Sequence, residues 1–126
     1  MRSKALLVLL PTLFFALSAG AAQSPAALYN AGNAAYAKGE FEEAIRDYRA
    51  ALDQGGVTAE VEYNLGNACL KAGQLGPAIV AYERALRLKP RDPDIAHNLR
   101  YARVQIKGKL PFFGASREYN HICMGI

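Results

Sequence analysis

The sequence has little of the chemistry on which enzymes and metal proteins depend. Its 126 residues include two histidines, two cysteines and no tryptophan. His97 stands at no set spacing from a cysteine or serine that would suggest a catalytic triad, and no phosphate-binding loop is present. The sequence therefore predicts that the chain is not an enzyme and uses no cofactor or metal.

The few groups that could carry chemistry have simpler explanations. Glu42-Glu43 and the pair Asp92 and Asp94 stand at expected helix starts, where negative charge is favourable without any catalytic role. His121 and Cys123 could be two ligands of a metal site, but nothing nearby supplies the others. We therefore expect no metal site.

The two cysteines are too few for a disulfide framework. Cys69 occupies a helix position that should face the core, so we expect a packing role rather than a nucleophile. A disulfide between Cys69 and Cys123 is permitted in an oxidising compartment, although it would require the core thiol to be exposed.

Long apolar runs are also scarce, and the main one, Ala5–Leu17, lies near the start. It follows Arg2 and Lys4 and precedes the small residues Ser18–Ala22, an order typical of an export signal. The run is shorter than the ~20 residues that a membrane span requires, and Pro11 interrupts it.

The pattern predicts a signal peptide over residues 1–22, cleaved after Ala21 or Ala22, and a mature protein in the periplasm. The alternative is an uncleaved segment that anchors the protein in the inner membrane. Membrane association is expected only in that case.

Charge of one sign is nowhere dense. Without the two basic residues of the predicted signal, 13 Lys and Arg stand against 11 acids. The basic excess lies near the end, at Arg100, Arg103, Lys107 and Lys109. A nucleic-acid surface usually has a denser patch, so a solvated helix face is the simpler interpretation and no nucleic-acid partner is expected.

What the sequence does contain is a repeat. Tyr29–Ala34 and Tyr63–Ala68 are near-copies 34 residues apart, and Asn98 begins the period a third time. Superposing residues 25–58 on 59–92 matches 11 of 34 positions. A fixed period of this length indicates a solenoid of stacked units.

The ends of the expected helices repeat with the same period. Ser24, Thr58 and Asp92 are helix-capping residue types, and Gly39 and Gly73 are expected to end helices. The sequence predicts helices at about 25–38, 41–54, 59–72, 76–89 and 93–107. The fold class is all-α: a right-handed solenoid over residues 24–107, with repeats at 25–58 and 59–92, a capping helix at 93–107 and an irregular tail at 108–126.

The repeat resembles the tetratricopeptide repeat, which has two antiparallel helices per unit and a pattern of small, aromatic and proline positions. No tryptophan stands in its first position, and Ala35 and Cys69 replace an aromatic. Glycines facing alanines would let the helices of a unit approach closely, and the tyrosines would wedge between neighbours. The motif residues are Gly32, Ala44, Tyr48, Gly66, Ala78, Tyr82 and Pro90.

The resemblance implies a concave face lined by the first helix of each unit and used to bind a protein partner. Relatives that clamp carboxylates have asparagines matching Asn33 and Asn64, but their cations have no match here. For Asn30, Asn64 and Asn98 we expect a structural role, in which they satisfy backbone groups between helices. The candidate partner-binding residues are Tyr29, Asn33, Tyr36, Tyr63, Asn67, Lys71, His97 and Tyr101.

Tyr63–Ala68, Ala78–Leu88 and Asp92–Leu99 are similar to the tetratricopeptide proteins of Bat aerotolerance operons. This resemblance implies an exported, non-catalytic scaffold that holds a peptide or helix of an envelope protein. The alternative is a structural subunit that associates with itself through Pro93–Lys107 or the first helix.

Overall fold

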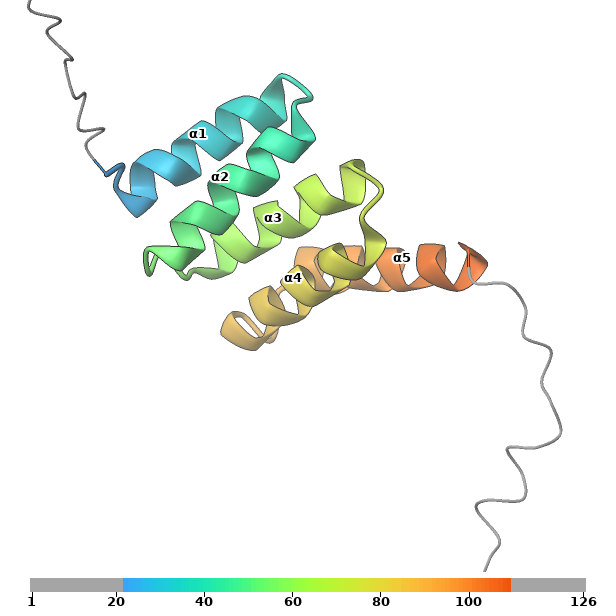
Figure 1. The fold of residues 1–126 in the computed structure, drawn as a ribbon. Helices are drawn as coiled ribbons and strands as arrows, with labels where there is room; N and C mark the ends of the chain where they lie inside the picture. Colours follow the sequence, from blue (N-terminus) through green and yellow to red (C-terminus); the bar gives the residue numbers. More distant parts are fainter. Residues whose placement is uncertain (1–21, 110–126) are drawn as a thin grey trace, which may run out of the picture.

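The computed structural model describes residues 22–109, which form five α-helices (Figure 1). Their bounds are α1 Pro25–Ala37, α2 Phe41–Asp53, α3 Ala59–Lys71, α4 Leu75–Leu88 and α5 Pro93–Lys109. The predicted all-α class is confirmed. Every helix end except the C-terminal end of α5 lies within one residue of its predicted position. The predicted end of α5 was wrong: the helix continues through Gly108 to Lys109. Residues 1–21 of the predicted signal peptide (1–22) and residues 110–126 of the predicted irregular segment, with His121 and Cys123, lie outside the described residues.

The helices pack in chain order, as two hairpins and one further helix. α1 packs on α2 and α3 on α4, while α2 contacts α3 and α4 contacts α5. This is the predicted arrangement of two units and a capping helix. Among the described helices, none has the length and apolarity required to cross a membrane.

The predicted capping residues begin the first helix of each unit. The backbone N–H of Ala27 donates to Ser24 Oγ, and that of Val61 donates to Thr58 Oγ1, each at 3.2 Å. Asp92 Oδ1 accepts from the N–H three residues on, also at 3.2 Å. Each bond satisfies an N–H that the helix itself leaves unpaired, so the three caps set where α1, α3 and α5 begin.

Gly39 and Gly73 end the first helices because only glycine adopts their backbone conformation without strain. Their φ angles are 80° and 77°. The N–H of Gly39 donates to the carbonyl of Tyr36 at 3.0 Å, and Gly73 repeats the bond with Leu70 at 3.1 Å. Both hairpins therefore turn in the same way.

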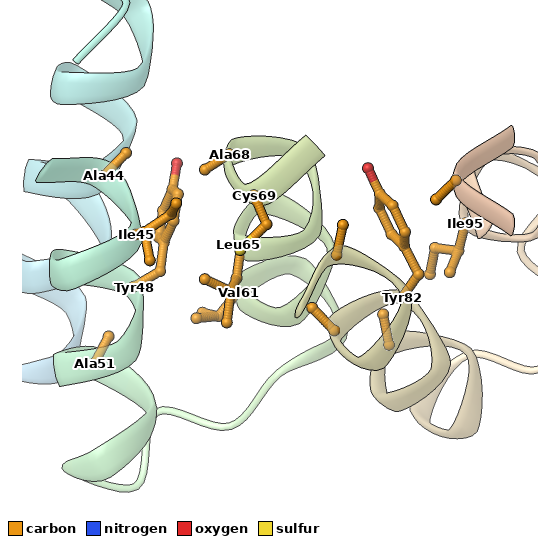
Figure 2. Close-up of a cluster of buried hydrophobic side chains, with 14 of the residues drawn as sticks. Ala44, Ile45, Tyr48, Ala51, Val61, Leu65, Ala68, Cys69, Tyr82 and Ile95 are labelled. Atoms are coloured by element: carbon orange, nitrogen blue, oxygen red, sulfur yellow. The ribbon is translucent and has the colours of Figure 1, made fainter. Parts of the chain in front are cut away.

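Two buried tyrosine rings organise the core. Tyr48 and Tyr82 have exposed fractions of 1% and 0%, and Figure 2 shows both hydroxyls pointing the same way. A Cβ atom on Gly32 would lie 2.7 Å from Tyr48 Cε1, and one on Gly66 would lie 2.6 Å from Tyr82 Cε1. The small residues thus allow the expected close approach, and what each glycine meets is the tyrosine ring.

Alanines and aliphatic side chains fill the space around these rings. Ala44 and Ala78, the expected small residues of the second helices, are fully buried. Cys69 is also fully buried, and burial raises the pKa of its thiol, which disfavours the reactive thiolate. Other members of the core are Leu28, Ile45, Ala51, Val61, Leu65, Ala68, Ala85, Ile95, Leu99 and Ala102.

We expect Gly66→Ala to lower the free energy of unfolding by about 1–3 kcal/mol, because the new methyl group overlaps the Tyr82 ring. Gly76→Ala is the matched control, since a Cβ there would meet no atom within 4 Å beyond its chain neighbours and the backbone of its own helix. Thermal unfolding followed by circular dichroism measures both. Equal melting temperatures would show that the ring does not lie on Gly66.

Glu62 is the exception in this core. It occupies the position of Leu28 in the first unit, yet its exposed fraction is 4% and its Oε2 has no hydrogen-bond partner among the described residues. Burial raises the pKa of its carboxyl, and Arg84 and Arg87 partly offset that rise. The charged carboxylate therefore costs stability.

Replacing Glu62 with leucine should raise the free energy of unfolding at neutral pH by about 1 kcal/mol, because an unpaired buried carboxylate is removed. The carboxyl's pKa is higher in the folded chain than in the unfolded one. Its cost is therefore present above the folded pKa and vanishes as the pH falls below the unfolded pKa.

Urea unfolding of the wild-type chain and of the Glu62→Leu variant measures this between neutral and acidic pH. The gain in the free energy of unfolding should become smaller as the pH falls. Glu60→Gln is the control, because Glu60 is exposed and a hydrogen bond from Lys89 lowers the pKa of its carboxyl. A gain that grows toward acid would contradict this account.

Candidate protein-binding face

A side-chain hydrogen-bond network joins the first unit to the second. Asn33 Oδ1 on α1 accepts from the Tyr48 hydroxyl at 2.7 Å and from Asn64 Nδ2 on α3 at 3.1 Å. Asn64 Nδ2 also donates to the Tyr29 hydroxyl at 3.1 Å. One amide of the second unit therefore binds two side chains of the first.

The same network recurs 34 residues later. Tyr82 donates to Asn67 Oδ1 at 2.7 Å, and Asn98 Nδ2 on α5 donates to Asn67 at 3.0 Å and to Tyr63 at 3.1 Å. We call each of these four-residue networks a rung. The rungs join α1 to α3 and α3 to α5, so α1, α3 and α5 together form one face.

Aromatic contacts accompany the rungs. The ring centroids of Tyr29 and Tyr48 lie 6.0 Å apart, as do those of Tyr63 and Tyr82. Burial and the neighbouring tyrosines raise the pKa of Tyr48 to about 12, and burial raises the pKa of Tyr82 as well. Both hydroxyls therefore keep their protons at neutral pH and act as donors to the asparagines.

The expectation that Asn64 and Asn98 satisfy backbone groups was wrong, because both donate to side chains of the preceding unit. Asn30, the equivalent residue of the first unit, is exposed. No unit precedes it among the described residues. The tyrosines Tyr48 and Tyr82 were expected only to pack, and their hydroxyls complete the rungs. The recurrence of asparagine at 30, 64 and 98 was the available signal.

The eight candidate residues fall into two groups. Tyr29, Asn33, Tyr63 and Asn67 are half-buried and belong to the rungs. Each thus has a structural role, and a binding role for the same side chains stays a prediction.

Lys71, His97 and Tyr101 are exposed, and Tyr101 has an exposed fraction of 49%. Tyr36 is half-buried and packs its ring edge-on against Phe41, with 5.4 Å between centroids. These four side chains are available for contact without breaking a rung.

The rungs fix which polar atoms point outward. Because the amide oxygens of Asn33 and Asn67 each accept two hydrogen bonds, their Nδ2 groups remain as donors. Within residues 22–109, Glu62 Oε2 is the one buried side-chain oxygen or nitrogen without a partner, so these nitrogens reach solvent. Tyr29 and Tyr63 accept from Asn64 and Asn98, which leaves their own protons to donate.

A small pocket of about 70 Å³ opens between the two rungs. It is too small for a drug-sized ligand, and it fits a single carbonyl or carboxylate group better. Its lining residues are Asn33, Tyr36, Tyr48, Asn64 and Asn67. In the part of the chain that the structure describes, no three His, Cys, Asp or Glu side chains are grouped to hold a metal.

Asn64→Ala should lower the free energy of unfolding by about 1–2 kcal/mol, because it removes two hydrogen bonds between units. Asn30→Ala changes the equivalent but exposed residue and should shift stability by less than about 0.5 kcal/mol. Denaturant unfolding of the two variants checks this. Equal midpoints would mean that the rung contributes nothing to stability.

Comparison with known proteins agrees with this architecture. The sequence model of the tetratricopeptide repeat matches residues 16–93, more than half of the chain. The matched range contains both hairpins and reaches the first residue of α5. No curated protein matches the chain. Tetratricopeptide repeats are typically non-catalytic and bind other proteins. Five helices in sequential hairpins, a 34-residue period and this match lead to one conclusion: the chain belongs to the tetratricopeptide repeat family.

Proposed function

We propose that this chain is an exported, non-catalytic scaffold that holds an extended segment of another envelope protein on the face of α1, α3 and α5. The observation that carries the proposal is the set of hydrogen-bond donors that the rungs leave unused on that face. Asn33 and Asn67 present amide N–H groups, and Tyr29 and Tyr63 present hydroxyl protons. An extended backbone offers carbonyl acceptors at regular intervals, which matches this set.

The exposed residues beside the rungs add contact area and charge. Tyr101 continues the stripe of Asn33 and Asn67 onto α5, and Lys71 places an ammonium group on α3. Aromatic side chains commonly supply much of the affinity of a protein interface. A segment with carbonyl acceptors and an acidic side chain near Lys71 is the partner chemistry that fits best.

The envelope setting is supported by the sequence. The basic start, apolar core and small residues of 1–22 are the pattern of an export signal. The resemblance of Tyr63–Ala68 and Asp92–Leu99 to proteins of Bat aerotolerance operons favours the same setting and a Bat-type partner.

Site-specific photo-crosslinking in cells tests the face and the compartment together. Benzoylphenylalanine at position 36 or 101 should form adducts with a partner, recovered in the periplasmic fraction. At position 46, an exposed residue of α2, it should form no adduct with that partner, because Arg46 belongs to neither rung. Adducts at 46 alone would place the partner elsewhere.

Once a partner segment is identified, Tyr101→Ala should weaken its binding by about tenfold, since truncation of an aromatic anchor commonly costs ~1–2 kcal/mol. Arg46→Ala should leave the affinity unchanged. Fluorescence anisotropy of the labelled segment measures both. Unchanged affinity in a folded Tyr101→Ala variant would remove α5 from the binding face.

A further inference from the structure

The two ends of the helical stack have opposite charge. Residues 22–74 carry four Lys and Arg against seven acids, whereas residues 75–109 carry eight against three. The net charges of these two parts are therefore −3 and +5. Because the helices pack in chain order, the negative charge lies toward α1 and α2 and the positive charge toward α4 and α5 (Figure 1).

A comparison of equivalent positions in the two units identifies the surface at the α1 and α2 end of the stack. We call this surface the head. Val61 and Ala68 on α3 have exposed fractions of 5% and 0%, whereas the equivalent Ala27 and Ala34 on α1 are exposed. Unit two buries these positions against unit one. In the described chain nothing covers them on α1.

Acidic side chains lie beside this uncovered surface on α2. Ala81 on α4 has an exposed fraction of 2%, and its equivalent in the first unit is the half-buried Asp47. Glu43 is exposed one turn before it and pairs with Arg46. The head therefore combines small side chains on α1 with carboxylates on α2.

The same comparison identifies the surface of α5 at the other end of the stack. We call this surface the tail; it is not the C-terminal segment 108–126. Gly66 and Cys69 are buried on α3 by α4, and the equivalent residues on α5 are the exposed Arg100 and Arg103. Lys107 follows one turn later and is also exposed. Arginine in the place of the glycine leaves no room for a tyrosine ring, so α5 cannot accept a sixth helix as α3 accepts α4.

A groove adjoins these arginines between α4 and α5. It has a volume of about 610 Å³, and Leu86, Pro90 and Leu99 give it an apolar floor. Arg87 and Arg103 lie at its edge, and Arg103 pairs with Glu83 at 2.8 Å. Exposed pairs of this kind are weak, so the arginine can exchange its carboxylate partner at little cost.

We propose that the tail of one molecule docks on the head of a second copy of this chain. Arg100, Arg103 and Lys107 of one copy would face Glu43 and Asp47 of the next, with the α1 alanines against α5. The head and the tail are different surfaces, so the contact is heterologous and repeats from copy to copy. It leaves the rung face open, and it does not depend on the function proposed for that face.

Sedimentation velocity of the purified full chain tests the proposal without any variant. Association should be detectable at about 50 mM salt and at least about tenfold weaker at about 500 mM, because exposed charge pairs are screened. A chain that stays monomeric at low salt across the accessible concentrations would overturn the proposal. The charged ends would then serve only to keep the stack soluble.

Charge exchange tests which surfaces meet. Glu43→Lys/Asp47→Lys and Arg100→Glu/Arg103→Glu should each abolish association alone, because the substituted residues of one surface then repel the charged residues that they are proposed to face. A one-to-one mixture should restore it. Association that persists in either variant overturns the proposal. Persistence is expected if the copies meet through the apolar run Ala5–Leu17 or as a symmetric dimer. A mixture of folded variants, checked by circular dichroism, that stays monomeric also overturns the proposal.

Discussion

The contact between a tyrosine ring and a glycine within each hairpin determines most of this structure. The ring of Tyr82 occupies the space that a side chain on residue 66 would need, and Tyr48 does the same at residue 32. The absence of a Cβ atom brings the two helices together, and the ring then fills the space between them and the next helix. The close approach also places the tyrosine hydroxyl beside the asparagine that directly follows the glycine. Packing within a unit and hydrogen bonding between units thus depend on one contact.

The rungs give the outer face a fixed chemical polarity. An isolated asparagine presents a donor and an acceptor, and its amide can rotate to suit either kind of ligand. In Asn33 and Asn67 the oxygen is held inward by two donors, so the nitrogen stays outward. A ligand that brings acceptors would find this arrangement already formed, and little side-chain entropy would be lost on binding.

Much of the fold could be predicted from the sequence because it depends on local signals that recur. The 34-residue period, the capping residues Ser24, Thr58 and Asp92, and the glycines that end α1 and α3 were sufficient to place five helices. The end of α5 was missed because Gly108 suggests a helix end, as Gly39 and Gly73 do, whereas the helix continues through it. Gly108 is tolerated inside the helix.

The polar network was harder to predict, because a period says that residues are equivalent and not which atoms they contact. Asn64 could have bonded to backbone or to side chains, and its choice depends on how closely α3 approaches α1. Glu62 was not predictable either. Its burial follows from the helix position that it shares with Leu28, whereas its residue type suggests an exposed side chain.

The rung also affects how such a chain can gain or lose units. Each rung takes one asparagine from the later unit and three side chains from the earlier one, and all of these positions recur every 34 residues. A duplicated or deleted 34-residue segment would therefore carry a complete set of donors and acceptors, and every junction would pair as before. Length can change in whole units without leaving an unpaired amide inside the stack, whereas an insertion of another length within one of these helices would break the pairing. The hydrogen bonds that stabilise this small protein are thus compatible with its growth by gene duplication.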